Sequence, residues 1–133
     1  MTIYTRSIFS ERIPSDGLRV SVMSRHTLND GKTPDIRIQE GKSYDLWIKD
    51  LAPPAELVGR WYNWKLRWED FQREYEVHLR QSDISEKVKK LASDALTKDI
   101  TLLCVEDTAH VCHRSILADE CKRYEENVEV VHR

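Results

Sequence analysis

The period of the hydrophobic positions changes along the chain, and each change marks an expected element. Two β-branched or aromatic stretches, residues 3–9 and 18–23, flank the turn-forming cluster Pro14-Ser15-Asp16-Gly17 and are predicted to be strands. The following segment, residues 29–43, has the composition of a loop. Its Gly41-Lys42-Ser43 lacks the upstream glycine that a phosphate-binding loop requires.

A helical period begins near Tyr44 and is interrupted at Pro53-Pro54, because proline is tolerated only in the first turn of a helix. The clearest period of the chain follows this break. Five aromatic residues spaced by three or four positions share one face of a predicted helix: Trp61, Trp64, Trp68, Phe71 and Tyr75. Such a face covers a sheet, so we expect these side chains to be buried rather than to stack on nucleic-acid bases. Another helix is predicted after Ser82-Asp83, which suit a cap.

The last third of the chain has the pattern of a strand, a helix and a second strand. Residues 100–105 form an unbroken apolar and β-branched run, typical of a strand buried on both faces in a parallel sheet. A polar loop leads to a helix predicted over residues 112–126, and residues 128–131 predict a closing strand. The full pattern predicts a single α/β domain over residues 1–133, with a small, mostly parallel sheet and helices packed on both faces.

Composition and charge narrow the classes of partner. The 40% hydrophobic and 33% charged residues are those of a folded globular domain rather than of a disordered chain. A net charge of −2 supplies no global attraction to nucleic acid or to an anionic membrane. The sequence shows no signal-peptide pattern and no apolar run that could span a membrane. Its three cysteines are odd in number and come late in the chain, which is not the pattern of a disulfide framework. We therefore expect a cytoplasmic protein with thiols and no membrane partner, and any nucleic-acid contact would have to be local. No motif specifies a cofactor or an oligomeric state.

One short segment holds most of the side chains that can do chemistry. Ligands of open α/β sheets bind beyond the carboxyl ends of the strands, where helix N-termini present unpaired N–H groups and a positive dipole end. The segment after the buried run lies at such an edge and contains Glu106, Asp107, His110, Cys112, His113 and Arg114. Arg25 follows the second predicted strand and is expected to reach the same edge. We expect the helix start at Cys112 to be open to solvent and to bind a small anionic ligand, a nucleotide or a phosphorylated metabolite, through Arg114, His113 and Arg25.

Several interpretations of this segment stay open. A cysteine at a helix N-terminus flanked by His and Arg favours the thiolate, so Cys112 is a candidate nucleophile, and any chemistry would use Cys112 or Glu106. The alternative is an ordinary, partly buried Cys112, with Glu106 and Arg114 forming only an ion pair that holds the loop.

Zinc and nucleic acid give two further alternatives. Cys104, His110, Cys112 and His113 are ligand types that suit zinc. Adjacent Cys112 and His113 rarely bind one ion together, however, so we expect no metal site. A function of another class is a non-catalytic nucleic-acid or protein interaction module, which would use an exposed aromatic and basic surface.

The chain also resembles the YeaO-like proteins, a domain family of unknown function (DUF488). The resemblance covers most of the chain and rests on Ser15-Asp16-Gly17-Leu18-Arg19-Val20, on residues 51–57 and 68–79, and on Ile100-Thr101-Leu102-Leu103-Cys104. One branch of the family has a strand that ends in Leu-Cys, a Glu two residues later and a Cys-His-Arg further on. Leu103-Cys104, Glu106 and Cys112-His113-Arg114 match that pattern, and residues 4–9 and Ser24-Arg25 are similar to the same branch. The resemblance implies membership of the family and no established activity.

Overall fold

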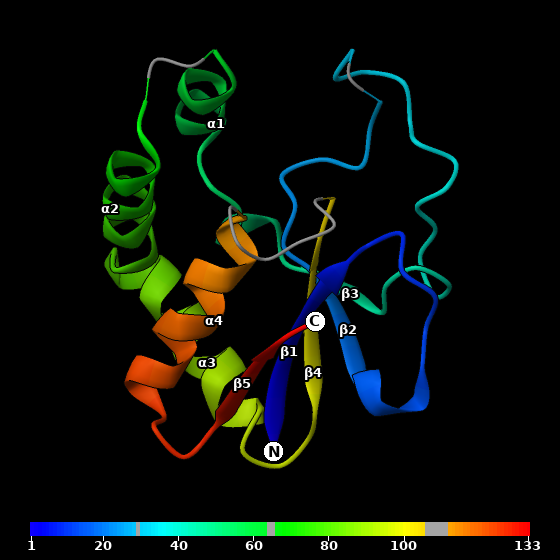
Figure 1. Ribbon diagram of the computed structural model, residues 1–133, viewed down its shortest axis with the longest axis vertical. Coiled ribbons are helices and arrows are strands. Elements are labelled where there is room, and N and C mark those ends of the chain that lie inside the picture. The colour runs from blue at the N-terminus through cyan, green and yellow to red at the C-terminus, as the bar shows by residue number, and fades with distance from the viewer. Residues whose placement is uncertain (29, 64–65, 106–111) are drawn as a thin grey trace.

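A parallel sheet of five strands organises the chain (Figure 1). The computed structural model describes residues 1–28, 30–63, 66–105 and 112–133. The strands are β1 (Thr2–Ser7), β2 (Leu18–Ser21), β3 (Leu46–Trp47), β4 (Ile100–Cys104) and β5 (Glu129–His132). They are ordered β3-β2-β4-β1-β5, and every neighbouring pair is parallel. The fully buried β4 is the central strand, as its unbroken apolar pattern predicts.

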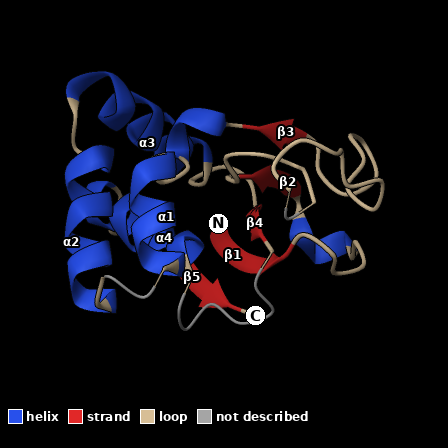
Figure 2. Cartoon of the chain, turned by 90° about the horizontal axis from the view of Figure 1, so that it is seen from above, coloured by secondary structure: helices blue, strands red, loops and turns tan. Residues whose placement is uncertain are grey.

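The four α-helices of the described residues gather on one side of this sheet, as the views in Figures 1 and 2 both show. They are α1 (Ala55–Tyr62), α2 (Trp68–Leu79), α3 (Ser82–Asp94) and α4 (His113–Tyr124). Helix α4 packs directly on β1, β4 and β5, while α2 and α3 pack on α4. Ile100 and Leu102 of β4 enter the same core as Leu117 and Cys121 of α4, because alternate residues of a strand share one face. No described helix is both long enough and apolar enough to cross a lipid bilayer.

The opposite face of the sheet is covered by irregular chain. Leu103 points away from Leu102 and packs with Ile8 and Met23 against Ile38 and Tyr44. The 3-10 helix η1 (Pro14–Asp16) lies on this face too, since the carbonyl oxygen of Asp16 accepts a hydrogen bond from Thr101 Oγ1 at 2.7 Å. The predicted α/β class with a parallel sheet is confirmed. In the described structure the α-helices form one covering layer, and the loop before β3 provides much of the other.

The segment before α1 differs from one expectation and confirms another. The segment from Tyr44 is not helical: Leu46 and Trp47 pair with Val20 and Ser21 as β3, and the 3-10 helix η2 (Lys49–Leu51) follows. Here the hydrogen bonding of Leu46 and Trp47 to β2 outweighs the local helical pattern of hydrophobic residues. The predicted break at the two prolines is confirmed, because α1 begins at Ala55 directly after them.

The aromatic face is divided between two helices instead of one. Trp61 belongs to α1, while Trp68, Phe71 and Tyr75 belong to α2, and Trp64 lies outside the described residues. Phe71 and Tyr75 are buried, and the half-buried Trp61 and Trp68 pack against the core with their rings 5.3 Å apart. The described aromatic residues therefore serve the core, as predicted. Phe71 and Tyr75 are therefore not available as a stacking surface for an interaction module.

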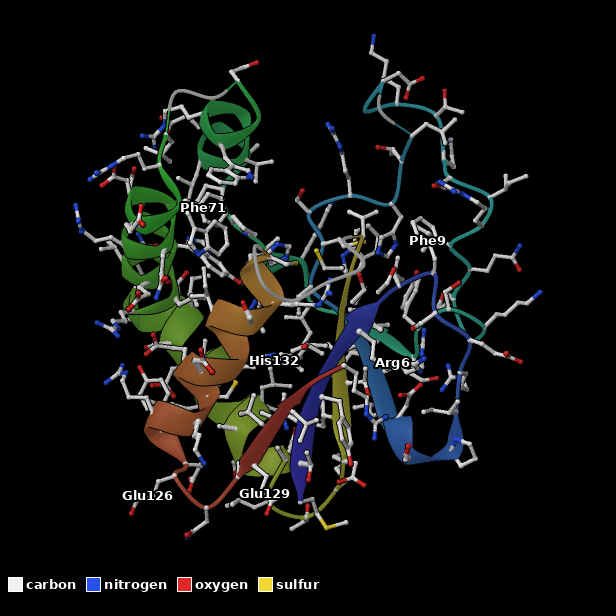
Figure 3. The ribbon with its side chains drawn as sticks, in the orientation of Figure 1. Arg6, Phe9, Phe71, Glu126, Glu129 and His132 are labelled. Carbon is white, nitrogen blue, oxygen red and sulfur yellow. The ribbon has the colours of Figure 1, made fainter. Side chains whose placement is uncertain are left out.

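A buried charge network joins η1 to two strands and to the C-terminus. Asp16 and Arg19 are both fully buried, and Arg19 Nη1 lies 2.7 Å from Asp16 Oδ2. The same carboxylate accepts hydrogen bonds from Arg6 Nη1 at 2.8 Å and from the backbone N–H of Ile13 at 3.1 Å, and Arg133 Nη1 lies 3.5 Å from it. Figure 3 shows Arg6 on the side of the sheet away from Phe71 and the helices. Asp16 thus ties η1, β1, β2 and the C-terminus together.

Candidate functional site

The end of β4 and the start of α4 bring two cysteines into contact. Cys104 is the last residue of β4 and shares the face of Ile100 and Leu102, so its side chain points to the helical layer. Cys112 is the N-cap of α4 and has an extended backbone, with φ −140° and ψ 140°. The two Sγ atoms are 2.9 Å apart, with the Cys112 thiol donating to Cys104.

His113, the first residue of α4, lies between this cysteine pair and the end of β2. Its Nε2 is 2.9 Å from the carbonyl oxygen of Val22, and its Nδ1 is 3.7 Å from Cys104 Sγ. A carbonyl can only accept a hydrogen bond, so Nε2 carries the proton of the neutral ring. The lone pair of Nδ1 then faces the Cys104 thiol and can accept its proton.

Tyr75 of α2 holds the imidazole from the other side. The two rings meet edge to face, with centroids 5.7 Å apart and an interplanar angle of 88°. The Tyr75 hydroxyl donates to the carbonyl oxygen of Leu51 at 2.5 Å, which fixes the ring. Burial, together with the nearby cysteines, raises the pKa of Tyr75 well above its usual value of 10.0. Tyr75 therefore stays protonated and acts as a rigid wall of the site.

Arg114 places a permanent positive charge beside the cysteines. Its side chain is fully buried, and Nη1 donates to Cys112 Sγ at 3.4 Å. A buried guanidinium stabilises a thiolate more than a thiol, and the N-terminus of α4 adds a partial positive charge at the same atom. Of the two sulfurs in contact, Cys112 is therefore the better placed to carry negative charge.

The contacts form one continuous chain through the site. Arg114 donates to Cys112, Cys112 donates to Cys104, and the Cys104 thiol faces Nδ1 of His113. A proton can pass from Cys112 through Cys104 to the imidazole along this chain. The result would be a thiolate next to the guanidinium and an imidazolium next to the Val22 carbonyl, an arrangement suited to thiol chemistry.

The same atoms have the donor types of a metal site. The ligand atoms of Cys104, Cys112 and His113 all lie within 4.8 Å of one another. Zinc would hold two thiolate sulfurs about 3.8 Å apart, given a tetrahedral ion with Zn–S distances of about 2.3 Å. The 2.9 Å between the Sγ atoms is shorter than that. Thiol chemistry thus fits the observed spacing better, and the absence of a metal site stays a prediction.

The sequence-predicted site residues have different outcomes. The structure brings Cys112, His113 and Arg114 together and adds Cys104 to them. Glu106 and His110 lie outside the described residues. Arg25 is exposed, and its described contacts are with the neighbouring loop, where Nη1 lies so near Gly31 that an added Cβ would meet it at 2.6 Å.

The expected opening of the helix start to solvent is wrong for two of its residues. Cys112 is only 2% exposed and Arg114 is fully buried, while His113 is partly exposed. The physical reason is that α4 packs between α2 and the sheet, with Tyr75 of α2 against His113, so the first turn of α4 is enclosed. The sequence does carry a signal for Cys104, because its alternation with Ile100 and Leu102 places it on the helical face at the end of the strand.

A cavity of about 700 Å³ lies elsewhere, between the end of β1 and the loop before β3. Its lining includes three basic residues, Arg12, Arg37 and Lys42. Arg12 is paired with Asp45 at 2.9 Å and Arg37 with Asp35 at 2.7 Å, so most of this positive charge is already compensated. The cavity therefore offers little uncompensated positive charge to an anion.

His26, beyond the end of β2, adds no positive charge to this edge of the sheet. Its ring stacks on Trp47 at 3.7 Å between centroids, and its Nε2 lies 2.7 Å from Ser21 Oγ. Burial, helped by the charge of Lys49, lowers the pKa of His26 from 6.5 to about 4. The imidazole is therefore neutral near pH 7.

Acidification is expected to destabilise the fold by protonating His26. Its folded pKa lies below the unfolded value of 6.5, so its contribution is fully present above pH 6.5 and is lost as the pH falls through about 4. An NMR titration of the native protein should give a midpoint near 4 for the His26 ring. His26→Gln should flatten the loss of stability between these pH values. A midpoint near 6.5 in the folded protein would contradict this environment.

Comparison with family models places the chain in a known family. The family model DUF488-N3a, described as the active DUF488-N3 subclade, matches residues 3–125. No curated protein and no solved structure matches the chain. The matched segment contains all four residues of the Cys104, Cys112, His113 and Arg114 cluster.

Proposed function

We propose that this chain, which belongs to the DUF488-N3a family, binds a small anionic ligand at the start of α4 and acts on it through Cys112. One observation carries the proposal: the buried guanidinium of Arg114 donates to Cys112 Sγ at the N-terminus of α4. A fixed positive charge and a helix N-terminus both favour negative charge at the same point. Nucleotides and phosphorylated metabolites are the ligand class that suits such a point.

Each predicted site residue has a role in this proposal. Arg114 attracts the anion through its charge from its buried position, and His113, which is partly exposed, contacts the anion and accepts a proton. Cys112 is the nucleophile, since the guanidinium favours its thiolate. Glu106 is the second candidate for acid–base work, and Arg25 supplies charge from the loop beyond β2. The protein would act in the cytoplasm, where thiols stay reduced.

Anions are expected to raise the melting temperature of the natural protein. A ligand that binds only the folded state stabilises it by mass action, by about 2.7 kcal/mol when its concentration is a hundred times its Kd. Phosphate, sulfate and a panel of nucleotides should be compared by thermal unfolding. Arg114→Gln should abolish the shift because it removes the charge at the helix start.

Arg73→Gln is the matched control, because Arg73 lies on α2 with its side chain 72% exposed. It should keep the full anion shift of the natural protein. Cys112→Ser should keep most of the shift too, since binding rests on Arg114 and chemistry on Cys112. If no anion raises the melting temperature, or if Arg114→Gln leaves the shift unchanged, the proposed anion site is wrong.

A further inference from the structure

The geometry points to a dithiol–disulfide couple in which Cys112 attacks a low-molecular-weight disulfide and Cys104 resolves the product. The inference uses the same site as the proposed anion binding but does not depend on it. Three observations carry it: the contact between the two sulfurs, the guanidinium on one of them, and the imidazole on the other.

The two sulfurs are already close to bonding distance. Their separation is 2.9 Å, and a disulfide bond is about 2.05 Å long, so the pair needs to close by about 0.9 Å. A rotation of either side chain can supply a movement of this size. The backbones are held by different elements, Cys104 by the central strand and Cys112 by the helix start, so the two sulfurs are presented to each other by the fold.

The neighbours of the two sulfurs are different, and the difference assigns their roles. Arg114 contacts Cys112, so the thiolate that attacks an external disulfide forms there. Cys104 lies between Cys112 and Nδ1 of His113, so its proton can leave to the imidazole when it attacks in turn. His113 is kept in the accepting tautomer by the Val22 carbonyl.

The reaction balances in two exchange steps. In the first, the Cys112 proton passes through Cys104 to His113, the Cys112 thiolate attacks one sulfur of the substrate disulfide to form a mixed disulfide, and the substrate thiolate that leaves takes the proton from His113, which is neutral again. In the second, Cys104 loses its proton to His113 and attacks Cys112 Sγ, which expels the second substrate thiolate and leaves a Cys104–Cys112 disulfide. Two protein thiols are oxidised, and one substrate disulfide is reduced to two thiols.

The third cysteine is a control within the same chain. Cys121 is fully buried in the core on the far turns of α4, and its Sγ lies 4.0 Å from the carbonyl oxygen of Val88. Burial, with the charge of Glu120, raises the pKa of Cys121 to about 12. It should stay a thiol in the folded protein.

The test uses reduced natural protein and oxidised glutathione as the probe. Acid quenching, alkylation and intact-mass measurement should show two thiols lost together, with one thiol still alkylated after unfolding. Peptide mapping should find the bridge between Cys104 and Cys112. Cys104→Ser should accumulate a mixed disulfide with glutathione on Cys112, because the resolving thiol is missing. Cys112→Ser should not react, and Cys121→Ser should behave like the natural protein.

Arg114→Gln should slow the first step about tenfold or more, since one pKa unit of lost thiolate stabilisation corresponds to tenfold. The natural protein decides the question even if a variant fails to fold. A bridge that involves Cys121, or one that forms only in unfolding concentrations of urea, would overturn the inference. So would one tightly bound zinc per chain that Cys112→Ser abolishes. If the natural protein does not exchange with oxidised glutathione but anions still raise its melting temperature, this inference is wrong and the proposed anion binding stands.

Discussion

Asp16→Ala is expected to destabilise the fold by about 3–5 kcal/mol, the usual cost of breaking a buried ion pair. That is a large part of the 5–15 kcal/mol by which domains are typically stable. The carboxylate is fully buried, and so is its partner Arg19. Its loss leaves the buried Arg19 guanidinium with the carbonyl oxygens of Ser43 and Ser10 but without the carboxylate that it pairs with. It also removes the acceptor of the Ile13 N–H.

The same carboxylate makes the fold sensitive to strong acid. Burial opposes its ionisation, but the hydrogen bond from Ile13, the hydrogen bond from Arg19 and the charges of Arg6 and Arg19 outweigh burial, so the pKa of Asp16 lies below 3.8. A lowered folded pKa contributes stability that is present above the unfolded value and is lost as the pH falls through the folded value. We therefore expect Asp16 to contribute fully at pH 7 and to lose its contribution only below about pH 3.8.

Urea unfolding of the natural protein and of Asp16→Ala at pH 7 measures the loss of stability, with Asp50→Ala as the control. Asp50 is bridged to Lys87 on the surface, where its side chain is 56% exposed. A surface bridge of this kind contributes about 0–1 kcal/mol, so this variant should unfold close to the natural protein. Equal losses for the two variants would show that the buried network of Asp16 is not a source of stability.

This network accounts for part of the sequence pattern that the chain shares with its family. The segment Ser15-Asp16-Gly17-Leu18-Arg19-Val20 holds the buried carboxylate, its buried arginine partner and a glycine in a close turn. These residue types are required by the fold rather than by a ligand. The family relationship therefore follows in part from folding, and the chemistry has to be argued from the Cys-His-Arg segment.

The elements that were predictable are those whose local pattern agrees with their final environment. β4 is buried on both faces, so its apolar run identified it, and α4 follows with its buried stripe of Leu117 and Cys121. β3 was not predictable, because only two residues, Leu46 and Trp47, pair with β2. A strand this short has no period of its own.

The candidate site was predictable in composition but not in geometry. The density of reactive side chains after β4 pointed to Cys112, His113 and Arg114. The contact between Cys104 and Cys112 could not be predicted, because the number of residues between them does not determine how close their side chains lie in the fold. The packing of His113 depends on Tyr75 of α2, a helix more than thirty residues earlier in the chain.

Gly17→Ala is expected to cost on the order of 4 kcal/mol, the sum of backbone strain and overpacking. Gly17 has φ 63° and ψ −134°, a conformation that residues with a side chain rarely adopt. An added Cβ would lie 2.1 Å from the carbonyl oxygen of Asp99 and 2.7 Å from its carbonyl carbon. That oxygen accepts the N–H of Leu18 at 3.0 Å, so the backbone cannot retreat without breaking the junction of β2 with the start of β4.

Alanine variants of two other glycines distinguish backbone strain from the steric clash with Asp99. All three variants are compared by urea unfolding. Gly41 has φ 82° with nothing within 4 Å of an added Cβ, so Gly41→Ala should show strain alone, about 1–2 kcal/mol. Gly59 lies within α1 with the same open surroundings, so Gly59→Ala should stabilise the protein by about 0.5–1 kcal/mol. The expected order of loss is Gly17, then Gly41, then Gly59. If Gly17→Ala costs no more than Gly41→Ala, the contact with Asp99 yields easily, and the junction between β2 and β4 is not the rigid point that supports the network of Asp16.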